Sequence, residues 1–349
     1  MSVSMVSQPT DLKERWAEFR KNNPKVRIRD AAEQLGVSEA QLVATGCGET
    51  ATRLEGTWSE ILDAVSPIGR VMALTRNEHA VHEKKGLYQG LETTGQVGLV
   101  HTEGIDLRIF FSRWKLGFVV SEDSGQAFMR HSLQFFDQAG TALHKIFLQP
   151  ESNFAALDEL VKRFRSEDQS PVQVVEPETT SKTIRPDADI DVRGLQEAWY
   201  TLKDTHDFFG MLRAFEVERT QAFRLVAADL ARPVSTQSAR QALTLASERE
   251  VSIMVFVGNP GIIQIHTGQV SKIVPYGDWI NVMDPDFNLH LRETGIASAW
   301  IVRKPTLDGD VTSLELFDQD GNNIALFFGE RKPGKPELQS WRNLLADIK

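Results

Sequence analysis

A single histidine within a run of large apolar residues is the first candidate for chemistry in this sequence. In the stretch WYTLKDTHDFFGML, residues 199–212, His206 follows Leu202 by four positions. Read as one helix, the segment puts this histidine on the apolar stripe formed by Leu195, Trp199, Leu202, Phe209 and Leu212. A neutral imidazole in an apolar, water-excluding surround is a good metal ligand, whereas a partly buried histidine can also simply bond a carbonyl and pack. The stretch alone leaves both interpretations open.

Several cations and aromatic residues elsewhere are candidates for the same site. Arg108 lies in DLRIF, Arg219 lies thirteen residues beyond His206, and Lys304 follows Arg303 at the end of a predicted strand. Phe110 and Phe256 lie on strand patterns. Taken alone, each cation is ordinarily a solvated surface charge and each aromatic ring is ordinarily part of a core. They can form a binding site with His206 only if the fold brings them together.

The segment NEHAVHEK contains a second group of potential ligands. Its members are His79, His82 and Glu83. Their spacing differs from the His-Glu-x-x-His of a helical zinc site, and the segment aligns with a strand pattern further along the chain. Residues three apart on a strand face opposite ways, so we do not expect a zinc site here.

Residues 29–46, RDAAEQLGVSEAQLVATG, have the apolar-Gly-apolar rhythm of a helix-turn-helix. The following stretch SEAQLVATGCGET has no Lys or Arg and two acidic residues, which would repel phosphate. The same pattern recurs in FEVERTQAFRLVA of the second half. We therefore favour packing over DNA binding, which stays a remote alternative.

Composition sets wider bounds. The 349 residues carry a formal net charge of −9, which argues against a protein that coats nucleic acid or an anionic membrane. The single Cys47 excludes an internal disulfide, and neither a leader-like start nor a long apolar segment is present, so we expect a cytoplasmic protein without membrane insertion. No Gly-rich phosphate loop or nucleophile elbow is found, which leaves kinase, dehydrogenase and conventional hydrolase interpretations without support.

The elements that must position these residues are written twice. SLQFFDQAG at 132–140 matches SLELFDQDG at 313–321 in six of nine positions, at an offset of 181. MALTRNEHAVHEKKG at 72–86 lies over MVFVGNPGIIQIHTG at 254–268, at an offset of 182. Two matches at nearly one offset indicate a duplicated domain. We predict an N-terminal extension at 1–24 and an N-terminal repeat at 25–165. A linker rich in proline and acidic residues follows at 166–192, and the C-terminal repeat spans 193–349.

Within each repeat, helical patterns precede short alternating runs. Turn residues between the runs indicate antiparallel hairpins. The predicted strand runs are 108–120, 132–148, 252–259, 262–274, 298–304 and 313–329, and the predicted closing helices are 156–165 and 337–348. The expected fold class is α+β, a tandem structural repeat in which each half is an antiparallel β-sheet with flanking helices, and the ligand cleft is expected between the halves.

Four segments carry a family resemblance. DLRIFFSRW, NEHAVHEK, DTHDFFGMLRAFEVERTQAFRLVAADLA and the duplicated SL-x-x-FDQ-x-G resemble the HemS/ChuS-type hemin-degrading and heme-trafficking proteins of bacterial heme-uptake systems. The resemblance covers the chain from about residue 25 onward. It implies one heme b, held in a cleft between the two halves, in a cytoplasmic protein of iron acquisition.

Carried over by position, the resemblance implies specific roles. His206, in the C-terminal repeat, becomes the axial ligand of heme iron, and Arg108 becomes the distal, catalytic group. Arg219 and Lys304 join the basic set that faces the propionates or lines the cleft. The aromatic lining comprises Phe110, Phe256 and Phe328. Some relatives have Gln and Tyr where this chain has Leu326 and Phe328, which removes two potential distal hydrogen bonds.

The implied function is porphyrin ring opening and iron release after heme import, with an external electron donor. The alternative is a non-enzymatic carrier or storage protein that delivers heme to a separate heme oxygenase. A helix-turn-helix DNA-binding heme sensor is a remote alternative. Expected partners are heme, a heme ABC importer, and a heme oxygenase or reductase; no nucleic-acid partner is expected. Arg108 aligns with His290 across the repeat, so the halves differ where chemistry is expected, which favours one site.

Overall fold

The chain divides into two compact units in the computed structural model, which describes residues 9–102, 104–123, 129–177, 184–331 and 334–349. Unit 1 comprises Met1–Thr75, Lys84–Thr179 and Asn259–Ile263, and unit 2 comprises Arg76–Glu83, Thr180–Gly258 and Gln264–Lys349. The main division therefore falls inside the predicted linker. Each unit also takes a short segment from the other half of the sequence, which the predicted domain bounds do not include. The first residues of the predicted extension and the middle of the linker lie outside the described residues.

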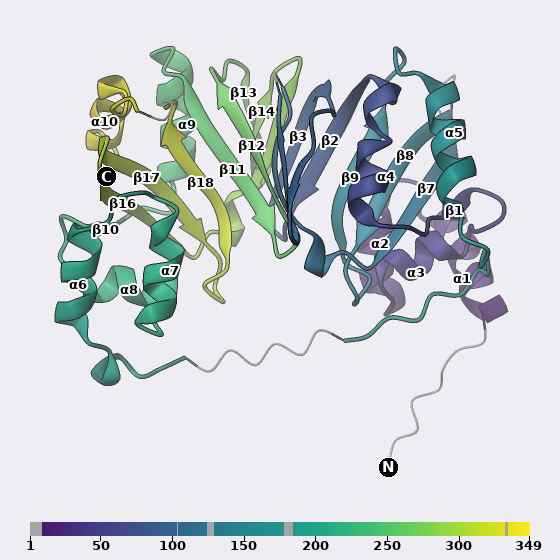
Figure 1. Cartoon of the computed structure of the whole chain (residues 1–349), viewed down its shortest axis with the longest axis horizontal. Coiled ribbons are helices and arrows are strands. Elements are labelled where there is room, and N and C mark those ends of the chain that lie inside the picture. The colour runs from purple at the N-terminus through teal and green to yellow at the C-terminus, as the bar shows by residue number, and fades with distance from the viewer. Residues whose placement is uncertain (1–8, 103, 124–128, 178–183, 332–333) are drawn as a thin grey trace. The chain divides into compact units, whose positions relative to one another are not determined.

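Unit 1 contains helices and two runs of antiparallel strands, which belong to different sheets (Figure 1). Its main run of strands is β1-β7-β8-β9-β2, and a second run is β6-β5-β4. The elements of the first half are α1 (Pro9–Asn22), α2 (Ile28–Leu35), α3 (Glu39–Ala44), β1 (Ala51–Arg53), α4 (Trp58–Asp63), β2 (Arg70–Arg76), β3 (Ala80–Leu87), β4 (Glu92–Thr94), β5 (Val97–His101), β6 (Asp106–Phe110), β7 (Leu116–Asp123), β8 (Met129–Phe136), β9 (Ala142–Leu148) and α5 (Phe154–Phe164).

Unit 2 repeats this plan. Its main run of strands is β10-β16-β17-β18-β11, and its second run is β15-β14-β13. The elements of the second half are α6 (Val192–Tyr200), α7 (Asp207–Ala214), α8 (Arg219–Leu225), β10 (Ala231–Val234), α9 (Ser238–Glu248), β11 (Ile253–Asn259), β12 (Ile262–Gly268), β13 (Ile273–Tyr276), β14 (Trp279–Met283), β15 (Phe287–Arg292), β16 (Ser298–Thr306), β17 (Gly309–Phe317), β18 (Asn323–Gly329) and α10 (Gln339–Ala346).

The pairing registers repeat at the offsets found in the sequence. Ser132 pairs with Phe147 in unit 1, as Ser313 pairs with Phe328 in unit 2. Leu99 lies opposite Arg108, and Asn281, 182 residues further on, lies opposite His290. The predicted α+β fold with a duplicated antiparallel sheet and flanking helices is confirmed.

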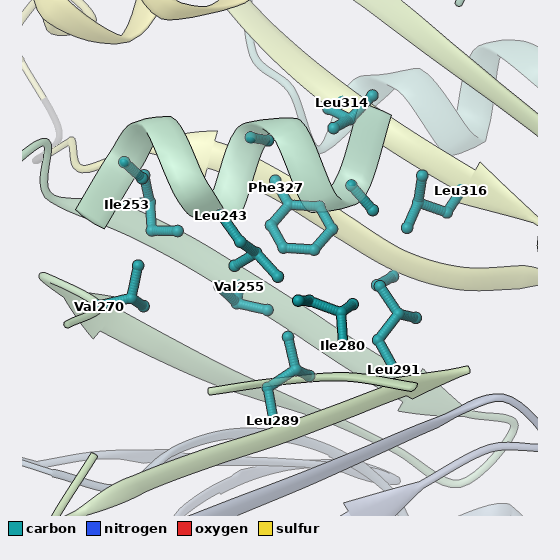
Figure 2. Close-up of a cluster of buried hydrophobic side chains, with 14 of the residues drawn as sticks. Leu243, Ile253, Val255, Val270, Ile280, Leu289, Leu291, Leu314, Leu316 and Phe327 are labelled. Carbon is teal, nitrogen blue, oxygen red and sulfur yellow. The ribbon is translucent and has the colours of Figure 1, made fainter. Parts of the chain in front are cut away.

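Helices cover the two faces of the unit 2 sheet differently. Side chains alternate along each strand, so Val255 of β11, Leu314 of β17 and Phe327 of β18 point to one face and are fully buried there. Helix α9 lies over this cluster through Leu243, as Figure 2 shows. On the other face, α6, α7 and α8 pack a second cluster against β16, built on Trp199, Phe208, Phe223, Trp300 and Phe317.

The structure adds detail to two of the sequence predictions, for the strand run 108–120 and for residues 29–46. The run 108–120 is two strands, because a 3-10 turn at Phe111–Arg113 points Phe111 and Trp114 inward, and the Trp114 indole donates to the Gly261 carbonyl at 2.9 Å. Residues 29–46 form α2 and α3, and nearly all of α3 is buried. Packing thus uses the surface that a DNA-reading helix would need. No helix among the described residues has the length and hydrophobicity needed to cross a membrane.

Candidate functional site

His206 lies at the start of a helix and is open to solvent. Helix α6 ends at Tyr200, α7 begins at Asp207, and the His206 side chain is 88% exposed. The prediction of one helix with His206 on its buried stripe is therefore wrong. Phe209, predicted on the same stripe, is also exposed, and Phe208 is buried in its place.

Local side-chain hydrogen bonds explain this break. The Thr201 hydroxyl donates to the carbonyls of Glu197 and Ala198 at 3.0 and 3.1 Å. The Asp204 carboxylate then accepts from the backbone N–H of His206 at 2.8 Å. Thr and Asp side chains that bond nearby backbone groups compete with helix continuation and favour turns. The chain consequently restarts as α7 with His206 at its N-cap.

The same carboxylate also contacts the imidazole ring. Asp204 Oδ1 lies 2.5 Å from His206 Nδ1. The backbone N–H of His206 is the main cause that lowers the pKa of Asp204, so the carboxylate is ionised and only accepts. In the neutral imidazole Nδ1 therefore carries the hydrogen, and Nε2 carries the lone pair. A carboxylate behind a histidine in this way fixes the tautomer and raises the basicity of the coordinating nitrogen.

An apolar wall lies on the sheet face opposite the α9 core. We define it by Met254 and Phe256 of β11 with Leu326 and Phe328 of β18. Met254 pairs across the strands with Phe328, and Phe256 pairs with Leu326, so all four side chains share one face. All four are half-buried. The rings of Phe256 and Phe328 meet edge to face, with their centroids 5.1 Å apart. This wall is chemically suited to a flat apolar ligand.

A buried ionic cluster lies on the same face of the sheet. Glu315 of β17 is fully buried and accepts from Arg219 Nε at 2.7 Å and Nη2 at 2.9 Å. Its Oε1 also accepts from Lys304 Nζ at 2.7 Å and from the Ser313 hydroxyl at 2.8 Å. We call Arg219, Glu315 and Lys304 the triad. Lys304 is 3% exposed and lies within β16, so it is not at a solvent-facing strand end.

The triad joins helix α7 to the apolar wall. Arg219 Cζ lies 5.0 Å from the centroid of the Phe208 ring, and Lys304 Nζ lies 4.8 Å from it. Lys304 Nζ is also 5.7 Å from the centroid of Phe328. The structure thus brings the α7 start, two of the predicted cations and two of the predicted aromatic residues into one connected region of unit 2.

Burial and charge act in opposite directions within the triad. Burial lowers the pKa of Lys304 to about 8, although Glu315 opposes this shift. Burial alone would raise the pKa of Glu315, yet the charges of Arg219 and Lys304 hold it well below its ordinary value. At neutral pH the cluster is two cations around one carboxylate.

Arg108 and Phe110 belong to unit 1. They lie on one face of β6, where Arg108 Nη1 bonds the Asp106 carboxylate and, at 3.2 Å, the Leu107 carbonyl. Asp106 also faces His101 Nδ1 at 3.2 Å. The Arg108 side chain is 34% exposed, so its guanidinium is oriented by a neighbour while part of it faces solvent.

Four residues of the unit 2 region were not predicted: Asp204, Phe208, Met254 and Glu315. Two had a sequence signal. Asp204 stands two positions before His206, the spacing of an Asx turn. Glu315 is one of the mismatches in the duplicated motif, where Gln134 stands in the first copy. The burial of Phe208 had no signal, because it depends on the helix break.

The chain is thus a duplicated α+β sheet domain whose second copy carries an exposed histidine, paired with a carboxylate, at the start of α7. The family model described as Haemin-degrading HemS.ChuX domain matches the chain twice, at residues 36–164 and 216–348. The chain belongs to this family.

Individual relatives span almost the whole chain. The hemin transport protein HemS of Yersinia enterocolitica is 40% identical over 336 residues, 96% of each chain. Holo-PhuS, a heme-binding protein from Pseudomonas aeruginosa, is 44% identical with a TM-score of 0.96, covering 98% of this chain and 99% of that one. ChuS, an E. coli heme oxygenase, is 37% identical with a TM-score of 0.87, covering 97% and 99%.

Proposed function

We propose that this protein binds heme on unit 2, with His206 Nε2 as the axial ligand of the iron. The observation that carries the proposal is the pairing of His206 Nδ1 with Asp204, which leaves Nε2 as an exposed lone-pair donor. Heme is a flat apolar disc with a metal at its centre and carboxylates at one edge. The apolar wall offers matching aromatic and aliphatic contacts through Phe256, Phe328 and Leu326.

The two cations take different roles in this proposal. Arg219 is 27% exposed, and its Nη1 has no hydrogen-bond partner among the described residues, so it is able to donate to a propionate while Glu315 holds the rest of the guanidinium. Lys304 is buried beside the wall, with its Nζ 5.7 Å from the centroid of the Phe328 ring. The roles implied by resemblance for Arg108 as the distal, catalytic group and for Phe110 as a pocket residue remain predictions.

The fate of the heme has two candidates. Ring opening with iron release follows from the family resemblance, and the ChuS relative is a heme oxygenase. In that case the heme and an electron donor supply the redox chemistry, and the protein holds the ligand and excludes water. A carrier role is favoured by the wall itself: Leu326 and Phe328 have no proton to donate, and the ionised groups nearest them are paired within the triad.

An anaerobic hemin titration, followed by reductant and then air, separates these candidates. Heme binding predicts a Soret band that saturates. A carrier predicts that this band persists through reduction and oxygenation. A heme-degrading enzyme predicts its decay with product absorbance, even with catalase present to remove free peroxide. The absence of any Soret band would contradict the proposal itself.

We further propose a cytoplasmic location, with a heme importer as donor and a heme oxygenase or reductase as downstream partner. The one cysteine, Cys47, is a free and buried thiol, which suits a reducing compartment.

A further inference from the structure

Glu315 is the centre of a buried network of ion pairs and hydrogen bonds. Its side chain is fully buried, and its two oxygens together accept from Arg219, Lys304 and Ser313. Arg219 begins helix α8, whereas Lys304 and Glu315 lie on adjacent strands. One carboxylate therefore ties a helix to two strands of the sheet.

Both cations of the network lie close to one aromatic ring, that of Phe208. Arg219 and Lys304 lie 5.0 and 4.8 Å from the Phe208 centroid, distances at which a cation is attracted to a ring face. The Phe208 ring also meets Trp199 edge to face at 4.6 Å. The ring is 1% exposed and held by charge as well as by packing.

Phe208 belongs to the turn that carries the candidate ligand. It is two residues after His206, and its backbone N–H donates to the Thr205 carbonyl at 3.3 Å, while that of Asp207 donates to the Asp204 carbonyl at 3.2 Å. Immobilising this ring therefore immobilises the turn in which Asp204 meets the imidazole.

The first repeat has the same strand arrangement but no glutamate at the position of Glu315. Gln134 occupies the position of Glu315, at the offset of 181, and donates to the Ser132 hydroxyl at 3.0 Å. The ionic pair between helix and sheet in unit 1 has the opposite polarity: Glu39 of α3 bonds Lys145 of β9. The duplicated fold thus forms without a buried glutamate at this position.

We propose that Glu315 is a positioning residue for the axial ligand: by holding Arg219 and Lys304 against Phe208, it fixes the start of helix α7 and hence the His206 imidazole. The inference rests on the proposed role of His206 in heme binding. Glu315 itself touches neither His206 nor, in this account, the heme.

The test compares Glu315→Gln with Glu337→Gln. Glu337 is also a buried glutamate of unit 2, which accepts from the Thr312 N–H at 2.7 Å and Arg342 Nε at 3.1 Å. Because Glu315→Gln leaves Lys304 buried without a full counter-charge, the double variant Glu315→Gln/Lys304→Met is measured beside it. The first readout is amide hydrogen exchange of residues 204–209 in heme-free protein. The second is the axial-ligand spectrum with hemin, compared with that of His206→Ala.

We expect both Glu315 variants to exchange residues 204–209 about tenfold faster than wild type, with Glu337→Gln unchanged there. With hemin, the Glu315 variants should keep a Soret band but shift toward the His206→Ala spectrum. Wild-type exchange and a wild-type ligand spectrum in both Glu315 variants would overturn the inference. If wild type and His206→Ala give the same spectrum, the proposed function fails instead, and the exchange data still decide whether Glu315 orders the turn.

Discussion

At His206 the chemistry depends on the carboxylate two residues earlier. Asp204 bonds both the backbone N–H and Nδ1 of this histidine, so one side chain creates the turn and selects the tautomer. The sequence identified the imidazole by its position among apolar residues, although that position is not buried in the fold. The family motif also marks this residue, and its physical setting depends on the helix break between α6 and α7.

Replacing Asp204 should weaken iron ligation without removing the histidine. For Asp204→Asn we expect hemin affinity to fall by about tenfold, because loss of an outer-shell carboxylate lowers ligand basicity and orientation. Equilibrium hemin titration measures this. Asp207→Asn is the control, since Asp207 is a neighbouring carboxylate in the first turn of α7. Equal affinities of the Asp204 and Asp207 variants would contradict the assigned role.

Glu315 should contribute stability that depends on pH. Its folded pKa is depressed by Arg219 and Lys304, so its contribution is fully present above the ordinary value of 4.5 and is lost as the pH falls toward the folded value. At pH 7 we expect Glu315→Gln to unfold with a free energy about 3 kcal/mol below wild type, because breaking a buried ion pair leaves charge uncompensated. Urea unfolding between pH 7 and pH 3 should show the difference shrinking below pH 4.5. A difference that stays constant over this range would exclude an ionised Glu315.

At the scale of elements, strands and closing helices follow from the sequence better than the α6–α7 connection. Alternation marks β11 and β18, because one face of each is buried under α9 and α10 while the other face carries the half-buried wall. The helical period across 195–212 also looked continuous, yet the Thr201 and Asp204 side chains interrupt it. A pattern of apolar residues records which side chains are buried and does not report such local hydrogen bonds.

Two glycine-to-alanine changes test how α7 and α10 are seated. In Gly210→Ala the added Cβ meets nothing within 4 Å, so we expect α7 to gain about 1 kcal/mol from helix propensity. In Gly329→Ala the Cβ would lie 2.7 Å from Trp341 Cβ at the start of α10, and we expect a loss of about 2 kcal/mol from overpacking. Chemical denaturation gives both values. Destabilisation by Gly210→Ala would show that α7 is packed more tightly than described.

Across the whole molecule, the two repeats share the strand arrangement and differ in the residues at the candidate site. The helix that corresponds to α7 in the first repeat is α2, whose N-cap is Arg27. Likewise, Lys145 stands on β9 where β18 has Leu326, and it pairs with Glu39. The repeat itself was predictable from two short matches, whereas the exchange of short segments between the units was not, because it depends on contacts between distant parts of the chain.

This divergence predicts one heme per chain. A hemin titration of the full-length protein should give a sharp end point at a one-to-one ratio. Among the residues that the structure describes, only the second repeat has a histidine paired with a carboxylate at the start of this helix. The Soret absorbance against added hemin measures the ratio. An end point at two hemes of equal affinity would mean that the first repeat has a site of its own.

The most direct test of the account is the hemin spectrum of His206→Ala beside that of His79→Ala. His79 is a histidine of unit 2 that lies against Gly295. We predict that His206→Ala loses affinity or changes the iron spin state, while His79→Ala binds as wild type does. Identical spectra for the two variants would contradict the central claim that His206 is the axial ligand.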